Sequence, residues 1–228
     1  MKAATSALAK AGERYSENVA LRAAVNLIPY VGGSLDVLFV SKGQSLIQKR
    51  VMKLLDDLKV EMSKLDDQAV NKAYLESEEW FDLVTRALEA SAKTRDGEKI
   101  KLYAKLLSST VSTQPDPHYS PEDYLAILSE LTPREIHVAR VLYDQQNDRP
   151  GEKEHELEWA QRKGWDRLAA QADVTKEELQ FSLLRLQRAG LAKEITGAIY
   201  NYGGGVYVIT DAFRGMMNYI HERVRTLP

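Results

Sequence analysis

Glu76, Glu78, Glu79 and Asp82 lie close to Trp80 and form the densest group of carboxylates in the first half of the chain. Paired carboxylates can exchange protons with a substrate, so this group is a candidate for acid–base chemistry. Acidic residues are also favoured in the first turn of a helix, where they interact with the positive end of the helix dipole. The dipole is the simpler explanation, and we predict a helix start here rather than a catalytic site.

The histidines and cysteines give little support for metal chemistry. The four histidines are scattered without HxxxH or HExxH spacing, and the acidic run around His155 is typical of solvated surface. The chain has no cysteine, which excludes thiolate zinc sites, iron–sulfur clusters and cysteine nucleophiles. We therefore expect no metal site, no cofactor and no enzymatic activity.

Charge and composition are those of an ordinary globular protein. The 228 residues carry 31 basic and 33 acidic side chains, and residues 133–228 carry 14 of each, so no global field attracts the chain to a polyanion. Charges also interrupt the apolar core that a secretory signal would need near the N-terminus. With the absence of cysteine, these features favour a cytoplasmic location.

Three helical patterns occupy the first half. Apolar residues recur at steps of three and four over residues 45–65, 69–93 and 97–111, with charged residues on the other faces. The proline-rich stretch STQPDPHYSP then stops any helix. We predict a helical bundle over residues 1–113, followed by a linker and connecting helix over 114–131, with Ser120 as N-cap before Pro121.

The second half, residues 132–228, begins with helix caps. Thr132 and Glu135 have the spacing of a capping box at the start of a helix. A short helix is predicted over 166–171, and Thr175 with Glu178 forms a second capping box after a turn. Gly190 follows that second helix, where a left-handed residue is needed to end it.

Short strands follow the second capped helix. Residues 192–196 and 206–210 are rich in β-branched and aromatic side chains, and three consecutive glycines at 203–205 suit the tip of a hairpin. Asp211 is then expected to cap a final helix. Apolar residues at helical spacing mark its inner face, from Phe213 to Ile220.

This order of elements, with the stretch DVTKEELQFSLLRLQRAGL, resembles the winged helix–turn–helix domain of many bacterial transcription regulators. The resemblance covers residues 132–223, about two fifths of the chain, and residues 1–119 resemble no characterised family. The expected fold class is mainly α: an N-terminal helical bundle and a C-terminal winged helix–turn–helix domain with a small β-hairpin.

In such domains the second helix enters the major groove of DNA, so the resemblance implies nucleic-acid contacts from exposed positions of that helix. These positions are Lys176, Gln180, Arg185 and Arg188. Gln180 suits an adenine edge and Lys176 a phosphate, whereas Glu177 and Glu178 lie at the end that approaches the polyanion. The expected hairpin tip carries no basic residue, so DNA binding would need a homo-oligomer or a local patch, and a protein partner is the alternative.

The apolar stretch NLIPYVGGSLDVLFV, residues 26–40, has three interpretations. The preferred one is a helical hairpin that turns at the Pro-Gly corner and folds back into the bundle. The others are a hairpin over 23–40 that inserts into a membrane, and an apolar face that dimerises. The membrane or partner contacts would be Leu27, Ile28, Tyr30, Leu35, Leu38 and Phe39.

These observations lead to one main hypothesis and two alternatives. The main hypothesis is a non-enzymatic DNA-binding or regulatory protein that binds double-stranded DNA, with the helical half used for dimerisation or for sensing a partner. The first alternative is a membrane-active effector of a toxin or phage-defence type. The second is a protein–protein adaptor.

Overall fold

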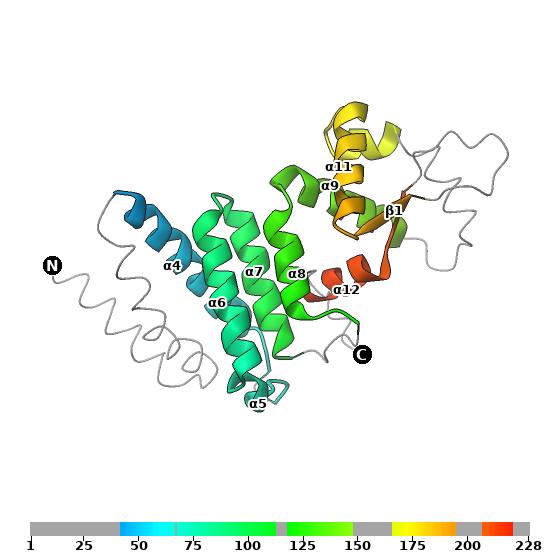
Figure 1. The fold of residues 1–228 in the computed structure, drawn as a ribbon. Helices are drawn as coiled ribbons and strands as arrows, with labels where there is room; N and C mark the ends of the chain where they lie inside the picture. The colour runs from blue at the N-terminus through cyan, green and yellow to red at the C-terminus, as the bar shows by residue number, and fades with distance from the viewer. Residues whose placement is uncertain (1–41, 67, 113–117, 148–165, 195–206, 221–228) are drawn as a thin grey trace. The chain divides into compact units, whose positions relative to one another are not determined.

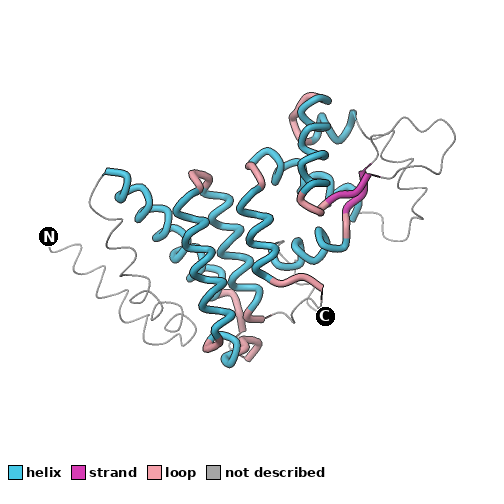
Figure 2. Tube along the Cα trace, viewed as in Figure 1, coloured by secondary structure: helices cyan, strands magenta, loops and turns pink. Residues whose placement is uncertain are grey.

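The computed structural model describes residues 42–66, 68–112, 118–147, 166–194 and 207–220 (Figure 1). This part of the chain is mainly helical, with a small antiparallel sheet of two strands (Figure 2). The chain divides into two compact units, residues 1–125 and 126–228. The division falls inside the segment 114–131 that the sequence marks as a connection.

The first unit is built from helices whose apolar stripes match the predicted ones. The helices are α4 (Lys42–Met62), α5 (Lys72–Leu75), α6 (Glu78–Lys93) and α7 (Gly97–Thr110). Helices α4, α6 and α7 contact one another, and each has a leucine that is fully buried: Leu54, Leu83 and Leu107. Burial of these stripes supplies the main stabilisation of the unit, because helices of this length are marginal alone.

The single helix expected over residues 69–93 is in fact two. Helix α5 ends before Ser77, whose hydroxyl accepts a hydrogen bond from the Trp80 N–H and caps α6. Glu78 and Glu79 lie in the first turn of α6, as the dipole argument predicts. A backbone hydrogen bond, and then one from Ser77, hold the pKa of Glu79 below its usual value.

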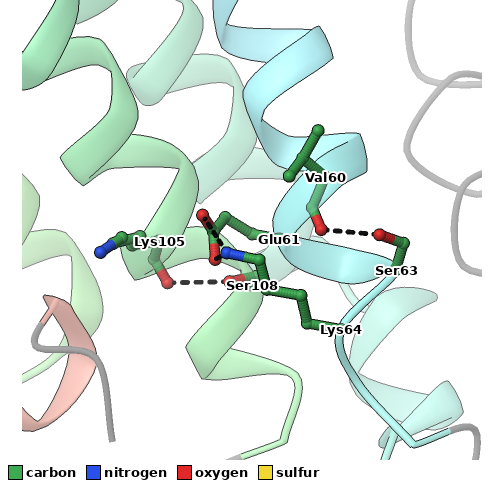
Figure 3. A network of polar contacts seen from close by, with 6 residues as sticks. All are labelled: Val60, Glu61, Ser63, Lys64, Lys105 and Ser108. Atoms are coloured by element: carbon green, nitrogen blue, oxygen red, sulfur yellow. Dashed lines mark hydrogen bonds and ion pairs between the residues drawn. The ribbon is translucent and has the colours of Figure 1, made fainter.

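Polar groups along α4 and α7 are satisfied locally (Figure 3). Lys64 Nζ lies 2.9 Å from both carboxylate oxygens of the buried Glu61. Ser108 Oγ donates to the Lys105 carbonyl at 3.0 Å. Each contact drawn in Figure 3 links residues three positions apart, so it satisfies a polar group within one helical turn and joins no pair of helices.

Helix α8 (Pro121–Glu130) spans the division between the units and begins at the predicted cap. Ser120 Oγ accepts from the Asp123 N–H at 3.2 Å, and Asp123 Oδ2 accepts from the Ser120 N–H at 3.0 Å. The two groups satisfy each other as in a capping box.

The second unit combines helices with the sheet. Its elements are α9 (Pro133–Asn147), a helix over residues 166–171, α11 (Lys176–Arg188), β1 (Ala192–Glu194), β2 (Tyr207–Ile209) and α12 (Asp211–Ile220). The strands pair antiparallel, with Ala192 opposite Ile209 and Glu194 opposite Tyr207. The strands lie within the predicted ranges, and the expected hairpin tip lies outside the described residues.

Candidate macromolecular interface on α11

A tight turn between two helices positions α11. The helix over residues 166–171 ends with a hydrogen bond from the Val174 N–H to the Ala169 carbonyl at 3.1 Å. Asp173 adopts a left-handed conformation with φ 49°, which aspartate tolerates better than most residues. The predicted turn over residues 172–174 is confirmed, and it fixes the direction in which α11 leaves.

The start of α11 is the predicted capping box. Thr175 Oγ1 accepts from the Glu178 N–H at 3.2 Å, and Glu178 Oε2 accepts from the Thr175 N–H at 3.0 Å. The backbone hydrogen bond from Thr175 is the main cause that holds the pKa of Glu178 below its usual value, and the nearby Arg134 guanidinium acts in the same direction. Arg134 Nη1 lies 2.8 Å from Glu178 Oε1, so the cap also joins α11 to α9.

The end of α11 is formed by a glycine and a threonine. Gly190 has φ 75°, and the Leu191 N–H bonds the Leu186 carbonyl at 2.9 Å, which confirms the predicted left-handed end. Thr210 Oγ1 donates to the Gly190 carbonyl at 2.7 Å and accepts from the Phe213 N–H at 3.2 Å. The expectation that Asp211 caps α12 is therefore wrong: Thr210 is the cap, and Asp211 is the first helical residue.

A buried carboxylate attaches the inner side of α11 to α9. The Glu135 side chain is only 3% exposed. Its Oε2 accepts from the Thr132 N–H at 2.8 Å, which confirms the first capping box, and its Oε1 lies 3.0 Å from Arg185 Nε. Both oxygens are thus used, as a carboxylate removed from water requires.

A buried amide supports the sheet from α9. Gln146 is 7% exposed, and its Nε2 donates to the Tyr207 carbonyl at 3.1 Å while its Oε1 accepts from the Ile209 N–H at 2.8 Å. These two backbone groups point to the same edge of β2, away from β1. The Gln146 amide therefore takes the place that a third strand would occupy.

The outer side of α11 is exposed and partly apolar. Leu179, Leu183 and Leu186 are buried, as predicted, which turns the opposite face toward solvent. Phe181 is 62% exposed and Leu184 is 48% exposed on that face. Glu177, Gln180 and Arg188 are exposed beside them, so an apolar centre lies between charged ends.

The four residues predicted to contact DNA do not form one free basic surface. Lys176 Nζ lies 2.6 Å from Asp166 Oδ1, and this hydrogen bond is the main cause that raises the pKa of Lys176. Arg185 is held at the inner edge by Glu135. Gln180 is exposed four positions after Lys176 and shares its edge of the helix, whereas Arg188 lies on the outer face.

The remaining predictions concern the apolar hairpin, membrane insertion and metal binding. Leu27, Ile28, Tyr30, Leu35, Leu38 and Phe39 lie outside the described residues. No helix among the described residues is long and apolar enough to cross a membrane. The same part of the chain contains no cluster of three or more His, Asp or Glu residues suited to a metal ion.

The burial of Glu135, which connects α9 to α11, and of Gln146, which connects α9 to β2, was not predicted from the sequence, although a signal for it exists. Glu135 and Gln146 fall on the apolar stripe of α9 with Ala139 and Leu142, at steps of four, three and four. Polar residues on a buried stripe need partners inside the protein. The pattern could have indicated their burial, but the partners, 50 and more than 60 positions away, could not be read from it.

Comparisons with protein-family models, with curated proteins and with solved structures found no significant match to this chain.

Proposed function

We propose that this chain is a regulatory protein whose second unit is a winged helix–turn–helix module that binds another protein through the outer face of α11. The exposed pair Phe181 and Leu184 is the observation that carries the proposal. An exposed aromatic side chain beside a leucine supplies the apolar anchor that protein interfaces use, and burying both gains about 25 cal/mol for each Å² removed from water.

The charges around α11 support a protein partner over DNA. Lys176, Arg134 and Arg185 each pair with a carboxylate, so three of the basic side chains on or beside the helix already have an acidic partner. Glu177 lies in the first turn, the end that approaches DNA in this class of module. A phosphate backbone would be repelled there, whereas a protein surface of mixed charge would not.

Site-specific photo-cross-linking in the full chain tests this function. A benzophenone amino acid at position 181 is expected to give an adduct of defined mass in cells that produce the protein. The same group at Arg167, an exposed position of the helix that precedes the turn, is the control and should give none. Equal yields at both positions, or no adduct at either, would contradict a protein contact through α11.

Duplex DNA is the second candidate, and the exposed Gln180 and Arg188 are the observations that favour it. Their positions suit an amide contact to an adenine edge and a cationic contact to phosphate. The DNA-binding and protein-binding functions can be distinguished by titrating labelled mixed-sequence duplexes with the protein. Binding is followed by fluorescence anisotropy, first at low salt and then at increasing salt. DNA binding predicts affinity that falls with salt and with Arg188→Ala, whereas the favoured function predicts no complex that depends on Arg188.

A further inference from the structure

Four residues form one line along the outer face of α11. Glu177, Phe181, Leu184 and Arg188 are separated by four, three and four positions, the spacing that keeps side chains on one side of a helix. All four are exposed. Within the described part of the chain, neither Glu177 nor Arg188 forms an ion pair, so both charges are available to a partner. We call this line the outer stripe.

The outer stripe is symmetric about its own centre. The position midway between Glu177 and Arg188 is also midway between Phe181 and Leu184. The apolar pair lies at the middle, and the two ends carry opposite charges. If a second, identical helix runs antiparallel to the first, an acid of one helix therefore lies opposite a base of the other at each end. At the centre, an apolar residue lies opposite an apolar residue.

We propose that a second copy of this chain docks on the outer stripe, with the two α11 helices antiparallel about a twofold axis that passes between Phe181 and Leu184. Glu177 then lies opposite the partner's Arg188, and Phe181 lies opposite the partner's Leu184. This inference rests on the proposed function and names its partner. It also gives the protein an isologous interface, in which each contact occurs twice.

Charge decides the direction of pairing. In a parallel pair in register, Glu177 would face the partner's Glu177 and Arg188 would face the partner's Arg188, so like charges would meet at both ends. The antiparallel pair converts both repulsions into attractions. Binding to an unrelated helix would not require this symmetry, so the self-complementary order of the outer stripe favours a second copy of the chain as the partner.

The length of the stripe sets the strength of the association. Helix α11 has 13 residues, fewer than two heptads, so the seam is short and the dimer belongs among weak, reversible complexes. Sedimentation velocity of the full chain, from low micromolar to millimolar concentration, is the suitable measurement. The wild-type protein is expected to change from monomer to dimer across this range.

Charge reversal tests the pairing directly. Glu177→Arg and Arg188→Glu each turn two attractions of the dimer into two repulsions, and each is expected to weaken self-association about tenfold or more. A mixture of the two variants restores opposite charges at both ends and should form a heterodimer with near wild-type affinity. Arg167→Glu reverses an exposed arginine away from the stripe and should leave association unchanged.

The apolar centre has a matched control in the other unit. Phe181→Ser is expected to abolish the dimer, while Leu46→Ser removes another exposed large apolar side chain from α4 and should have no effect. Circular dichroism of each variant shows whether it keeps the wild-type fold. Mixing the two charge variants also controls for misfolding, because a misfolded variant could not recover association when the other variant is added.

Three results would overturn self-pairing. They are a wild-type chain that stays monomeric throughout, charge variants that associate like the wild type, and a mixture that fails to recover association. The cross-linking experiment separates this inference from the proposed function. An adduct at position 181 with twice the mass of the chain supports both, an adduct of another mass overturns self-pairing alone, and no adduct overturns both.

Discussion

The inner and outer sides of α11 carry similar residue types but use them differently. On the inner side, Arg185 pairs with the buried Glu135, whose second carboxylate oxygen accepts from the Thr132 N–H. On the outer side, Glu177 and Arg188 flank two exposed apolar residues. Charge on this helix therefore supports the fold where it meets the buried carboxylate of α9, and it is available for recognition where it has no partner among the described residues.

The largest stability effect is expected from Arg185→Ala. The substitution leaves the Glu135 carboxylate buried with one oxygen unpaired, and we expect a loss of about 2–3 kcal/mol because Arg185 itself is partly exposed. Urea unfolding monitored by circular dichroism measures the change. Arg188→Ala, on the outer side of the same helix, is the matched control and should change stability by less than about 0.5 kcal/mol. Equal losses in the two variants would remove the distinction between the sides.

Gln146→Ala tests the amide that completes the sheet. The Tyr207 carbonyl and the Ile209 N–H lose their partner at a buried edge, which should cost about 2 kcal/mol. Gln145→Ala removes a neighbouring glutamine of α9 whose bond to Gln171 is exposed, and it should cost much less. If the two variants unfold at the same urea concentration, Gln146 does not hold the strand.

Gly190→Ala isolates the backbone contribution at the end of α11. A Cβ at this position would meet no atom within 4 Å, so any cost comes from the left-handed conformation at φ 75°. We expect a loss of about 1 kcal/mol. Gly190→Asn is the comparison, because asparagine tolerates this conformation better. If Gly190→Ala is as stable as the wild type, the end of α11 does not require a left-handed residue at position 190.

The capping carboxylate of α11 predicts a small dependence on pH. The folded pKa of Glu178 lies below the ordinary value of 4.5, so its stabilisation is present above that pH and is lost as the pH falls through the folded pKa. Thermal unfolding should therefore show Glu178→Gln less stable than the wild type at neutral pH, with the difference shrinking in acid. A stability difference between Glu178→Gln and the wild type that stays the same at every pH would contradict this role of the Glu178 carboxylate.

Local signals in the sequence predicted much of this fold. The capping boxes at Thr132 and Thr175, the glycine at 190 and the apolar stripes all depend on residues a few positions apart, so the pattern alone specifies them. The cap at Thr210 was missed because Asp211 beside it offered an equally good signal, and the break before Ser77 was missed because the apolar spacing continues across it.

The candidate site was predicted less completely than the fold. The exposed positions of α11 follow from its buried leucines, and Lys176, Gln180 and Arg188 are indeed exposed. The partners of Lys176 and Arg185 were not foreseen, since an ion pair between segments depends on how distant helices pack. Helical spacing shows which way a side chain points but not whether its charge is already neutralised.

The different uses of the two sides of α11 are tested most directly by measuring stability and self-association in a single variant, Phe181→Ser. Because the Phe181 side chain lies on the exposed face, we expect an unfolding midpoint equal to that of the wild type. We also expect the variant to lose the concentration-dependent dimer in sedimentation velocity. A lower midpoint would show that Phe181 supports the fold. A dimer that persists with wild-type affinity would show that the outer face is not the surface that binds.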